Sequence, residues 1–417
     1  MIHKDSPPGS PEMEEGLDED DLIYIGDVDE VLEVLEGEDS NEDDNNEDDE
    51  GMEKEQPEMG HSLCVFNKHE GSVFCGSLSK DGKLAVTGGE DDMAYVWDTA
   101  SSQVVLECKG HEDSVIFAGF NFDDSYVATG DMSGNIKVWK VKDESTVWDY
   151  CMGDATWMHW HEKTNVLFAG SVGGDVYMWH IPDGTCKIFQ GFGQRTVTAV
   201  ILADGLRLAV GYEDGTVRVM DLKSGKVQSS SVPGTGHSSA ITALGCPSNG
   251  KVIISAALDG KTILRTTQTG VVVAVLQELQ EHKAVSVEQS GENSAMETDE
   301  NWVEAVAICT DIELDLAATG TINGEIYIWD ITRKVIRHKI SQDSGITNLV
   351  WKRKTSFLFS AGLDGVLRCY DARTGECIKS FEGHNETILD LNISADGTRI
   401  LTTSDDSTAR IFDITMC

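Results

Sequence analysis

The sequence contains few basic residues. Its 417 residues include 32 Lys and Arg against 73 Asp and Glu, so the formal net charge is −41 at pH 7. Proteins that bind nucleic acids need Lys and Arg to neutralise phosphates, and this composition therefore disfavours direct nucleic-acid binding. Repulsion from anionic lipids disfavours a membrane surface in the same way. The charge instead favours a basic protein or peptide as the partner.

Long apolar segments and paired cysteines are also missing. The sequence has no run of 18 apolar residues, and its first ten residues, MIHKDSPPGS, contain no apolar signal segment. The ten cysteines occur without a CxxC pair or a regular spacing, which indicates reduced thiols in the core rather than disulfides. We therefore expect a monomeric cytoplasmic protein, with the nucleus as an additional location, that does not insert into a membrane.

Motifs of enzymes and metal sites are absent as well. Residues 161–165 do not complete an HExxH motif, and the sequence contains neither a GxSxG elbow nor a glycine-rich phosphate loop that follows a strand and opens a helix. His159 and His161 lie two residues apart, but no Cys or acidic cluster with metal-ligand spacing accompanies them. We expect no enzymatic activity, no cofactor and no bound metal.

What the sequence does contain is a repeat. A histidine precedes an aromatic residue by 28 positions three times, at His69 and Trp97, His111 and Trp139, and His384 and Phe412. Without gaps, the same spacing relates five weaker pairs: Cys151 and Trp179, Phe192 and Met220, His237 and Arg265, Asn301 and Trp329, and Gln342 and Tyr370. The eight residues six positions before each closing residue include Asp91, Asp214, Asp259, Asp364 and Asp406. This is a WD-repeat signature, and it predicts an all-β fold, an eight-bladed WD-repeat β-propeller.

The His, Asp and aromatic positions have two interpretations. A histidine and an aspartate in fixed relation can orient a catalytic base. In a WD blade, however, such residues form a buried hydrogen-bonded chain that ties two turns to the sheet, and this interpretation is much the stronger. We therefore predict structural roles for His69, Asp91, Trp97, His111, Trp139, Trp179, Asp214, His237, Asp259, Trp329, Asp364, Tyr370, His384, Asp406 and Phe412.

The acidic residues divide the chain into two parts. Residues 1–61 contain 25 Asp or Glu against Lys4 and Lys54, a net charge of −23, and are expected to form a disordered acidic N-terminal tail. Within it, residues 21–35 have helical apolar spacing and are either a docking segment or a sticky stretch of a disordered tail. Residues 62–417 form the propeller, in which Leu63 to Asn67 supply the outermost strand that blade eight lacks. An acidic insertion at 277–301 should lie over one face.

That face is the predicted partner site. Acidic residues beside the turn positions would converge at the mouth of the ring and attract a basic ligand, although a solvated rim that only aids solubility would look similar. Trp157, near the same rim, is either an exposed anchor for a partner or packed inside its blade. The predicted partner-binding residues are Glu70, Glu90, Asp92, Glu112, Asp113, Asp131, Asp154, Trp157, Glu213, Glu386 and Asp405.

Several segments resemble one family of WD-repeat proteins. AVTGGEDDMAYVWD (85–98), VATGDMSGNIKVW (127–139), CKIFQG (186–191), AVGYEDGTVRV (209–219) and LDGVLRCYDARTGE (363–376) are similar to the angio-associated migratory cell protein family of animals. That family is related to a fungal WD-repeat chaperone of a basic large-subunit ribosomal protein. The resemblance implies a chaperone or adaptor that holds a basic ribosomal protein segment during ribosome assembly.

Two other functions remain open. A signalling scaffold in cell migration and angiogenesis would recruit partners through residues 21–35. A substrate receptor of a ubiquitin ligase is suggested by Tyr370-Asp371-Ala372-Arg373, which resembles a WDxR box with Tyr in place of Trp. Such tetrapeptides arise readily in WD repeats.

Overall fold

The computed structural model describes residues 58–231, 235–279, 301–311 and 313–417, which form 32 β-strands and no α-helix. The predicted docking segment at 21–35 and most of the predicted acidic tail and insertion lie outside these ranges. Within the described ranges, no helix has the length and hydrophobicity that a membrane crossing requires.

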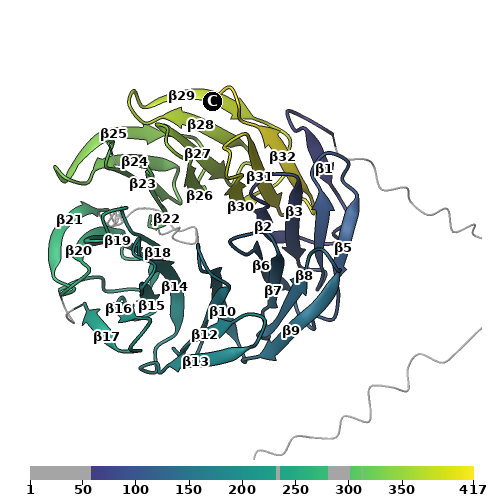
Figure 1. Cartoon of the computed structure of the whole chain (residues 1–417). Coiled ribbons are helices and arrows are strands. Elements are labelled where there is room, and N and C mark those ends of the chain that lie inside the picture. The colour runs from purple at the N-terminus through teal and green to yellow at the C-terminus, as the bar shows by residue number, and fades with distance from the viewer. Residues whose placement is uncertain (1–57, 232–234, 280–300, 312) are drawn as a thin grey trace, which may run out of the picture. The chain divides into compact units, whose positions relative to one another are not determined.

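The strands form eight antiparallel four-stranded sheets, the blades, arranged in a ring (Figure 1). Blade 1 consists of β2 (Val73–Leu78), β3 (Leu84–Gly89), β4 (Ala94–Asp98) and β5 (Val104–Cys108), and blade 2 consists of β6 (Val115–Phe120), β7 (Tyr126–Asp131), β8 (Asn135–Lys140) and β9 (Ser145–Cys151). Blade 3 consists of β10 (Ala155–Trp160), β11 (Val166–Ser171), β12 (Val176–His180) and β13 (Thr185–Phe189). Blade 4 consists of β14 (Thr196–Ile201), β15 (Arg207–Tyr212), β16 (Val217–Asp221) and β17 (Val227–Ser230).

Blade 5 consists of β18 (Ile241–Gly245), β19 (Val252–Ala257), β20 (Lys261–Thr266) and β21 (Val272–Glu278). Blade 6 consists of β22 (Val303–Ile308), β23 (Leu316–Thr321), β24 (Glu325–Asp330) and β25 (Val335–Ser341). Blade 7 consists of β26 (Ile346–Trp351), β27 (Phe357–Gly362), β28 (Leu367–Asp371) and β29 (Glu376–Phe381). Blade 8 combines β30 (Ile388–Ile393), β31 (Arg399–Ser404) and β32 (Ala409–Asp413) with β1 (Cys64–Phe66) from the other end of the propeller. The predicted eight-bladed propeller is confirmed.

Strand β1 closes the ring. It pairs antiparallel with β32, with Cys64 opposite Ile411 and Phe66 opposite Ala409, as expected from the missing outer strand of blade 8. The ring of Phe66 also stacks on Trp97 of blade 1, with the centroids 4.7 Å apart and the planes 6° from parallel. The first strand therefore bonds to blade 8 and packs against blade 1, and it gives blade 8 the same four strands as the other blades.

Described contacts with the propeller begin before the predicted boundary at residue 62. The buried guanidinium of Arg410 donates a hydrogen bond of 2.7 Å to the carbonyl of Glu58. The backbone N–H of His61 donates to the carbonyl of Glu382 at 2.9 Å. These contacts add a short lead-in segment to the strand that the sequence predicted.

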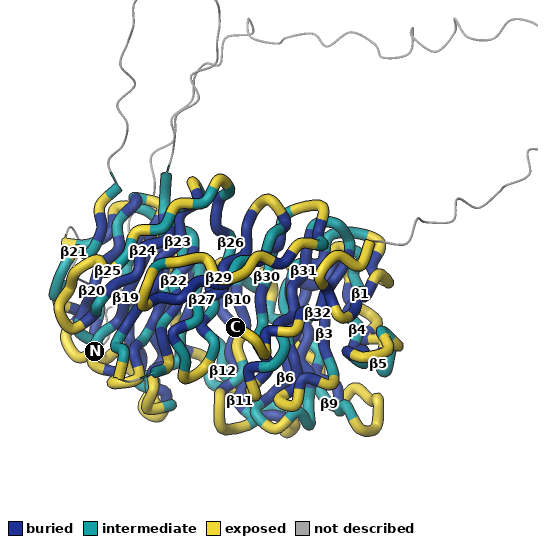
Figure 2. The backbone as a smooth tube through the Cα atoms, turned by 90° about the horizontal axis from the view of Figure 1, so that it is seen from above, coloured by how far each residue is buried: buried dark blue, intermediate teal, exposed yellow. Residues whose placement is uncertain are grey.

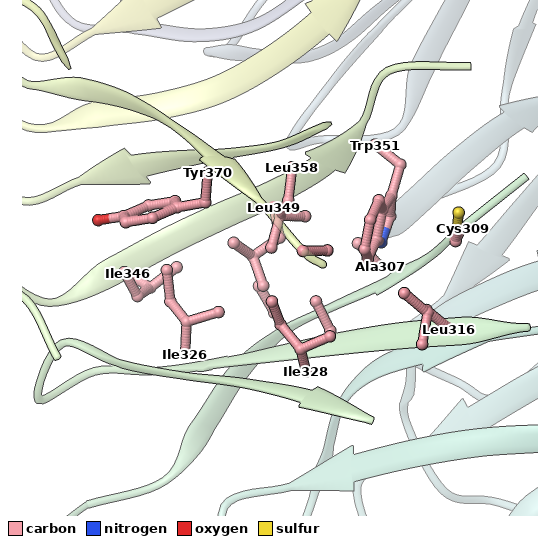
Figure 3. Close-up of a cluster of buried hydrophobic side chains, with 13 residues drawn as sticks. Ala307, Cys309, Leu316, Ile326, Ile328, Ile346, Leu349, Trp351, Leu358 and Tyr370 are labelled. Carbon is pink, nitrogen blue, oxygen red and sulfur yellow. The ribbon is translucent and has the colours of Figure 1, made fainter. Parts of the chain in front are cut away.

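The hydrophobic core lies between neighbouring blades. The clusters of buried apolar side chains follow the ring from one blade pair to the next, because each sheet buries both of its faces against its neighbours. Figure 3 shows the cluster between blades 6 and 7, where Ile326 and Ile328 of β24 meet Leu349 and Trp351 of β26. Figure 2 shows the resulting pattern, in which buried strands lie between exposed loops on both faces.

Blade 6 departs from the ungapped repeat. Its first hairpin, between β22 and β23, pairs Val303 with Thr321, whereas blade 1 pairs Val73 with Gly89. The hairpin in blade 6 is therefore two residues longer. The assignment of Asn301 to the histidine position was wrong by two residues, because a hairpin on one face can lengthen without a change in the strands.

Candidate functional site

The loops and turns of the propeller form two faces. Each blade has its loop into the innermost strand and its turn between the second and third strands on the same side, which we call the acidic face for the charge described below. In every blade the residue seven positions before the closing residue donates its backbone N–H to a carbonyl of that loop, over 2.9 to 3.2 Å. In blade 1, for example, Glu90 donates to Ser72. The eight turns are thus fixed in equivalent positions around the ring.

The two faces differ strongly in charge. The described residues of the acidic face contain 17 Asp or Glu and three bases, Lys68, Lys109 and Arg195, a net charge of −14. These described residues are loop residues 67–72, 109–114, 152–154, 190–195, 231, 235–240, 279, 301–302, 342–345 and 382–387 and turn residues 90–93, 132–134, 172–175, 213–216, 258–260, 322–324, 363–366 and 405–408.

The opposite face is nearly neutral. Its described residues contain 12 Asp or Glu and 13 Lys or Arg, a net charge of +1. It comprises hairpins 79–83, 121–125, 161–165, 202–206, 246–251, 309–315, 352–356 and 394–398 and turns 99–103, 141–144, 181–184, 222–226, 267–271, 331–334 and 372–375. An even distribution of surface acid for solubility would not produce this difference between faces.

Nine of the eleven predicted partner-binding residues lie on the acidic face with exposed or partly exposed side chains: Glu70, Glu90, Asp92, Glu112, Asp113, Asp154, Glu213, Glu386 and Asp405. Seven of them belong to blades 8, 1 and 2. The loops also orient these carboxylates. Glu90 accepts the backbone N–H of Ser72 at 3.1 Å, and Asp113 accepts that of Ser114 at 2.8 Å.

The structure does not place the other two predicted residues at the surface. Asp131 is fully buried at the end of β7, where its carboxylate accepts a hydrogen bond from Nδ1 of His111 at 3.1 Å. It takes the role that the repeat assigned to Ser133, whose hydroxyl donates to Asp131. Trp157 is only 8% exposed and packs between blades 3 and 4. Of its two interpretations, packing inside the fold is the one the structure favours.

Four blades contain the expected buried network, and blade 2 illustrates it. Trp139 Nε1 donates to Thr129 Oγ1 at 3.0 Å, and His111 Nε2 lies 2.8 Å from the same hydroxyl. Because the carboxylate of Asp131 can only accept, Nδ1 of His111 carries the proton of this bond. In the neutral imidazole Nε2 then accepts from the Thr129 hydroxyl, which completes a continuous donor chain. Equivalent histidine bonds are His69 to Asp91 and Thr87, His237 to Asp259 and Ser255, and His384 to Asp406 and Thr402.

The pKa values are consistent with a neutral histidine and a charged aspartate. Burial lowers the pKa of His111 and of His384 below the ordinary value. Burial acts to raise the pKa of Asp406, but hydrogen bonds from His384, Thr408 and the backbone N–H of Asn385 outweigh it and hold that pKa at about 2. Removing the carboxylate would leave the buried Nδ1–H without an acceptor.

The remaining blades use other contacts. Asp214 and Asp364 do not meet a histidine: Asp214 accepts from Thr216, and Asp364 forms an ion pair with Arg368 at 2.6 Å. In blade 7, Tyr370 donates to Gln342 at 2.9 Å, and in blade 6 Trp329 donates to Thr319 at 3.0 Å. Trp179 is buried, but its Nε1 has no hydrogen-bond partner among the described residues. The structural roles of these residues therefore rest on packing and local turns.

The centre of the ring holds a cavity of about 500 Å³ between the inner strands of blades 1, 2, 3 and 8. His159 and Asp390 line it. Asp390 is partly buried and accepts hydrogen bonds from the backbone N–H of Gly76 and from the side chain of Asn348, both at 3.1 Å. Burial raises the pKa of Asp390 to about 6. Among the described residues, no group of three or more His, Cys, Asp or Glu is arranged to hold a metal ion.

Comparisons with known proteins agree with this geometry. A family model of the WD domain, G-beta repeat, matches residues 60–98, 102–140, 230–264 and 375–413. The human angio-associated migratory cell protein is 40% identical over 352 residues, which cover 84% of this chain and 80% of the human protein. This chain belongs to the angio-associated migratory cell protein family. The ribosome assembly protein SQT1 of Saccharomyces cerevisiae is a more distant relative of this chain. It is 23% identical, and the match covers 91% of this chain and 93% of the yeast protein.

Solved structures of other proteins have the same fold as this chain. The structure of Chaetomium thermophilum Sqt1 bound to the N-terminus of the ribosomal protein L10 has a TM-score of 0.72 at 20% identity, over 85% of this chain and all of that chain (100%). The computationally designed Ika8 protein has a TM-score of 0.69 at 21% identity and covers equal shares. Because a designed protein matches nearly as well, the likeness establishes the fold and not a ligand.

The WDxR-like tetrapeptide lies on the other side of the ring. Tyr370 is buried and donates a hydrogen bond to Gln342, whereas Arg373 is exposed in the turn between β28 and β29. The guanidinium of Arg373 pairs with Asp371 at 2.8 Å. This position is remote from the acidic face, so the two predicted surfaces can be altered separately.

Proposed function

We propose that this protein is a non-enzymatic binding propeller that holds a basic segment of a ribosomal protein on its acidic face during assembly of the large ribosomal subunit. The observation that carries the proposal is the charge of −14 on one face against +1 on the other. A concentrated negative potential raises the encounter rate with a cationic polypeptide and neutralises it once bound. Binding would keep such a segment from aggregation and from stray contacts with RNA.

The relatives support the choice of client. The yeast relative is named a ribosome assembly protein, and a fungal Sqt1 with the same fold has been crystallised with the N-terminus of ribosomal protein L10. A propeller presents loops from eight blades to one ligand, so an extended peptide can contact several of the nine acids at once. No chemistry on the client is required for this role.

The test compares two charge reversals of equal size. Glu90→Lys with Glu213→Lys alters the acidic face, whereas Glu162→Lys with Glu313→Lys makes the same change in total charge at exposed residues of the opposite face. Binding of a labelled peptide with the sequence of the L10 N-terminus is measured by fluorescence anisotropy over a series of salt concentrations. We expect the first variant to bind about tenfold more weakly at low salt and the second to bind as the parent does.

The outcome distinguishes the site from bulk charge. Equal weakening by both variants would show that only net charge matters, and undiminished binding by the first variant would refute the proposed face. The difference should shrink as salt rises, because added ions screen exposed charges.

A further inference from the structure

In each blade, the residue seven positions before the closing residue occupies the same place in the turn between the second and third strands. Across the eight blades this position carries two kinds of side chain. The eight equivalent residues, each fixed by the backbone hydrogen bond described above, are Glu90, Met132, Val172, Glu213, Leu258, Ile322, Leu363 and Asp405 in blade order. Three are acids and five are large apolar residues. Sequence reasoning identified the acids and missed the apolar residues, although all eight lie seven positions before a closing residue.

The fold does not require apolar residues at these positions. The contact common to all eight positions is made by the backbone N–H, and Glu90, Glu213 and Asp405 fill the same position in other blades. Four of the apolar residues are also well exposed: Met132 by 51%, Val172 by 43%, Leu258 by 46% and Leu363 by 41%. Turns normally carry polar residues, and exposed apolar side chains grouped on one face mark an interaction surface.

Three of the five apolar residues lie in consecutive blades. Leu258, Ile322 and Leu363 belong to blades 5, 6 and 7, which we call the apolar arc, whereas Met132 and Val172 belong to blades 2 and 3. Blades 8, 1 and 2 follow the apolar arc directly and carry the acidic arc, the seven exposed or partly exposed acids Glu386, Asp405, Glu70, Glu90, Asp92, Glu112 and Asp113. Blades 7 and 8 are in contact, so the two arcs are continuous.

We propose that the acidic face is a bipartite docking site for a polypeptide whose large apolar side chains lie on the apolar arc and whose Lys and Arg side chains lie on the acidic arc. The inference rests on the proposed function and specifies its ligand more closely. Charge complementarity selects a cationic partner, and the apolar arc adds a requirement that charge alone does not impose. A purely basic segment would leave the apolar arc exposed to water.

The test must also distinguish the proposed polypeptide from a competing candidate within the chain, the insertion at residues 280–300. Its described ends meet at one turn, because a Cβ atom added to Gly260 would lie 3.0 Å from Leu279 Cβ and 3.3 Å from the carbonyl oxygen of Asn301. A short glycine linker can therefore join residues 279 and 301 in a variant that lacks the insertion. If the insertion covered the arc, this variant would bind an apolar ligand more tightly than the parent.

The test uses two labelled synthetic peptides of 14 residues, each with the same six arginines. One carries three leucines beside the arginine run, and the other has serine in their place. Anisotropy titrations on the full chain should give at least about tenfold tighter binding of the leucine peptide. Leu258→Ser with Leu363→Ser should reduce this ratio to about twofold or less, whereas Glu90→Lys with Glu213→Lys should weaken both peptides and leave the ratio unchanged.

A matched control comes from the outer strands of the same blades. Val275 in β21 and Ile378 in β29 are 52% and 48% exposed, so Val275→Ser with Ile378→Ser makes the same kind of change away from the face and should keep the ratio. Equal binding of both peptides by the parent, or tighter leucine-peptide binding without the insertion, would overturn the inference and leave the proposed function intact. No binding of either peptide would overturn both.

Discussion

At the scale of single residues, buried polar contacts decide which residues are structural. Asp131 shows why sequence register alone misplaces such residues. The repeat assigns the turn carboxylate of blade 2 to the position of Ser133, and the actual carboxylate lies two residues earlier, at the end of the strand. A side chain from either position can reach His111, and only the folded structure shows which one does.

Asp131→Ala should lower the free energy of unfolding by about 2 to 4 kcal/mol, because it removes the acceptor of a buried imidazole N–H and of four further hydrogen bonds. Ser133→Ala, at the position that the repeat indicates, should cost less than about 1 kcal/mol. Urea unfolding followed by tryptophan fluorescence measures both. Equal losses would mean that Asp131 has no special role.

Asp390 should give the propeller an unusual pH dependence. Its pKa is raised to about 6, so the folded protein holds the proton more tightly than the unfolded chain does. This contribution is therefore most favourable below pH 4, and up to about 3 kcal/mol is lost as the pH rises through 6. Asp390→Asn removes the titration, so its stability relative to the parent should rise between pH 4 and pH 7 in urea unfolding.

The control for Asp390 is a carboxylate with the opposite shift. Hydrogen bonds from Arg373 hold the pKa of Asp371 at about 2, so its contribution is complete above pH 4 and is lost only as the pH falls toward 2. Asp371→Asn should therefore cost a constant amount between pH 4 and pH 7. A constant difference for Asp390→Asn over the same range would contradict the raised pKa.

At the scale of elements, strand β1 does most to hold the ring closed. It supplies the fourth strand of blade 8, and Phe66 is 1% exposed between blades 8 and 1. Phe66→Ala should therefore cost about 3 to 5 kcal/mol, the range for loss of a buried aromatic side chain. Leu63→Ala, one residue before the strand and 54% exposed, should change stability by less than about 0.5 kcal/mol. Thermal or urea unfolding measures both, and a small effect of Phe66→Ala would argue against closure by β1.

Elements with a regular period were predictable from the sequence. The spacing of the closing residues predicts the number of blades, and the last repeat, which has only three strands of its own, predicts the strand exchange with β1. The histidine networks of blades 1, 5 and 8 follow from the same spacing. The longer hairpin of blade 6 does not, since two added residues lengthen the connection between β22 and β23 and leave the strands unchanged.

The candidate site was predictable only in part. Acids beside the turns stand out in the sequence, and nine of them do lie on one face. Burial of Trp157 and Asp131 depends on contacts between blades that periodicity does not describe. The exposed apolar residues were missed because the sequence argument considered only the acids at this position. The common backbone hydrogen bond shows that Leu258 and Leu363 occupy the same place in the turn as Glu90.

At the scale of the whole molecule, the charge on the acidic face opposes folding. Like charges held on one face repel each other, and the unfolded chain separates them. The fold gains nothing evident from this arrangement, since several blades form equivalent turns with neutral residues. The acid is therefore explained better by binding than by stability.

This conflict predicts how salt and charge reversal affect stability. Raising the ionic strength from about 0.01 to 0.3 M should raise the thermal unfolding midpoint, because screening weakens the repulsion. At low salt, Glu90→Lys with Glu213→Lys should stabilise the protein by about 0.5 to 1 kcal/mol, whereas Glu162→Lys with Glu313→Lys on the neutral face should have a smaller effect. Calorimetry at both salt concentrations measures the difference. Equal stabilisation by the two variants would show that the repulsion depends on the total charge alone. The acidic face would then have no separate cost in stability, and the argument from stability to binding would fail.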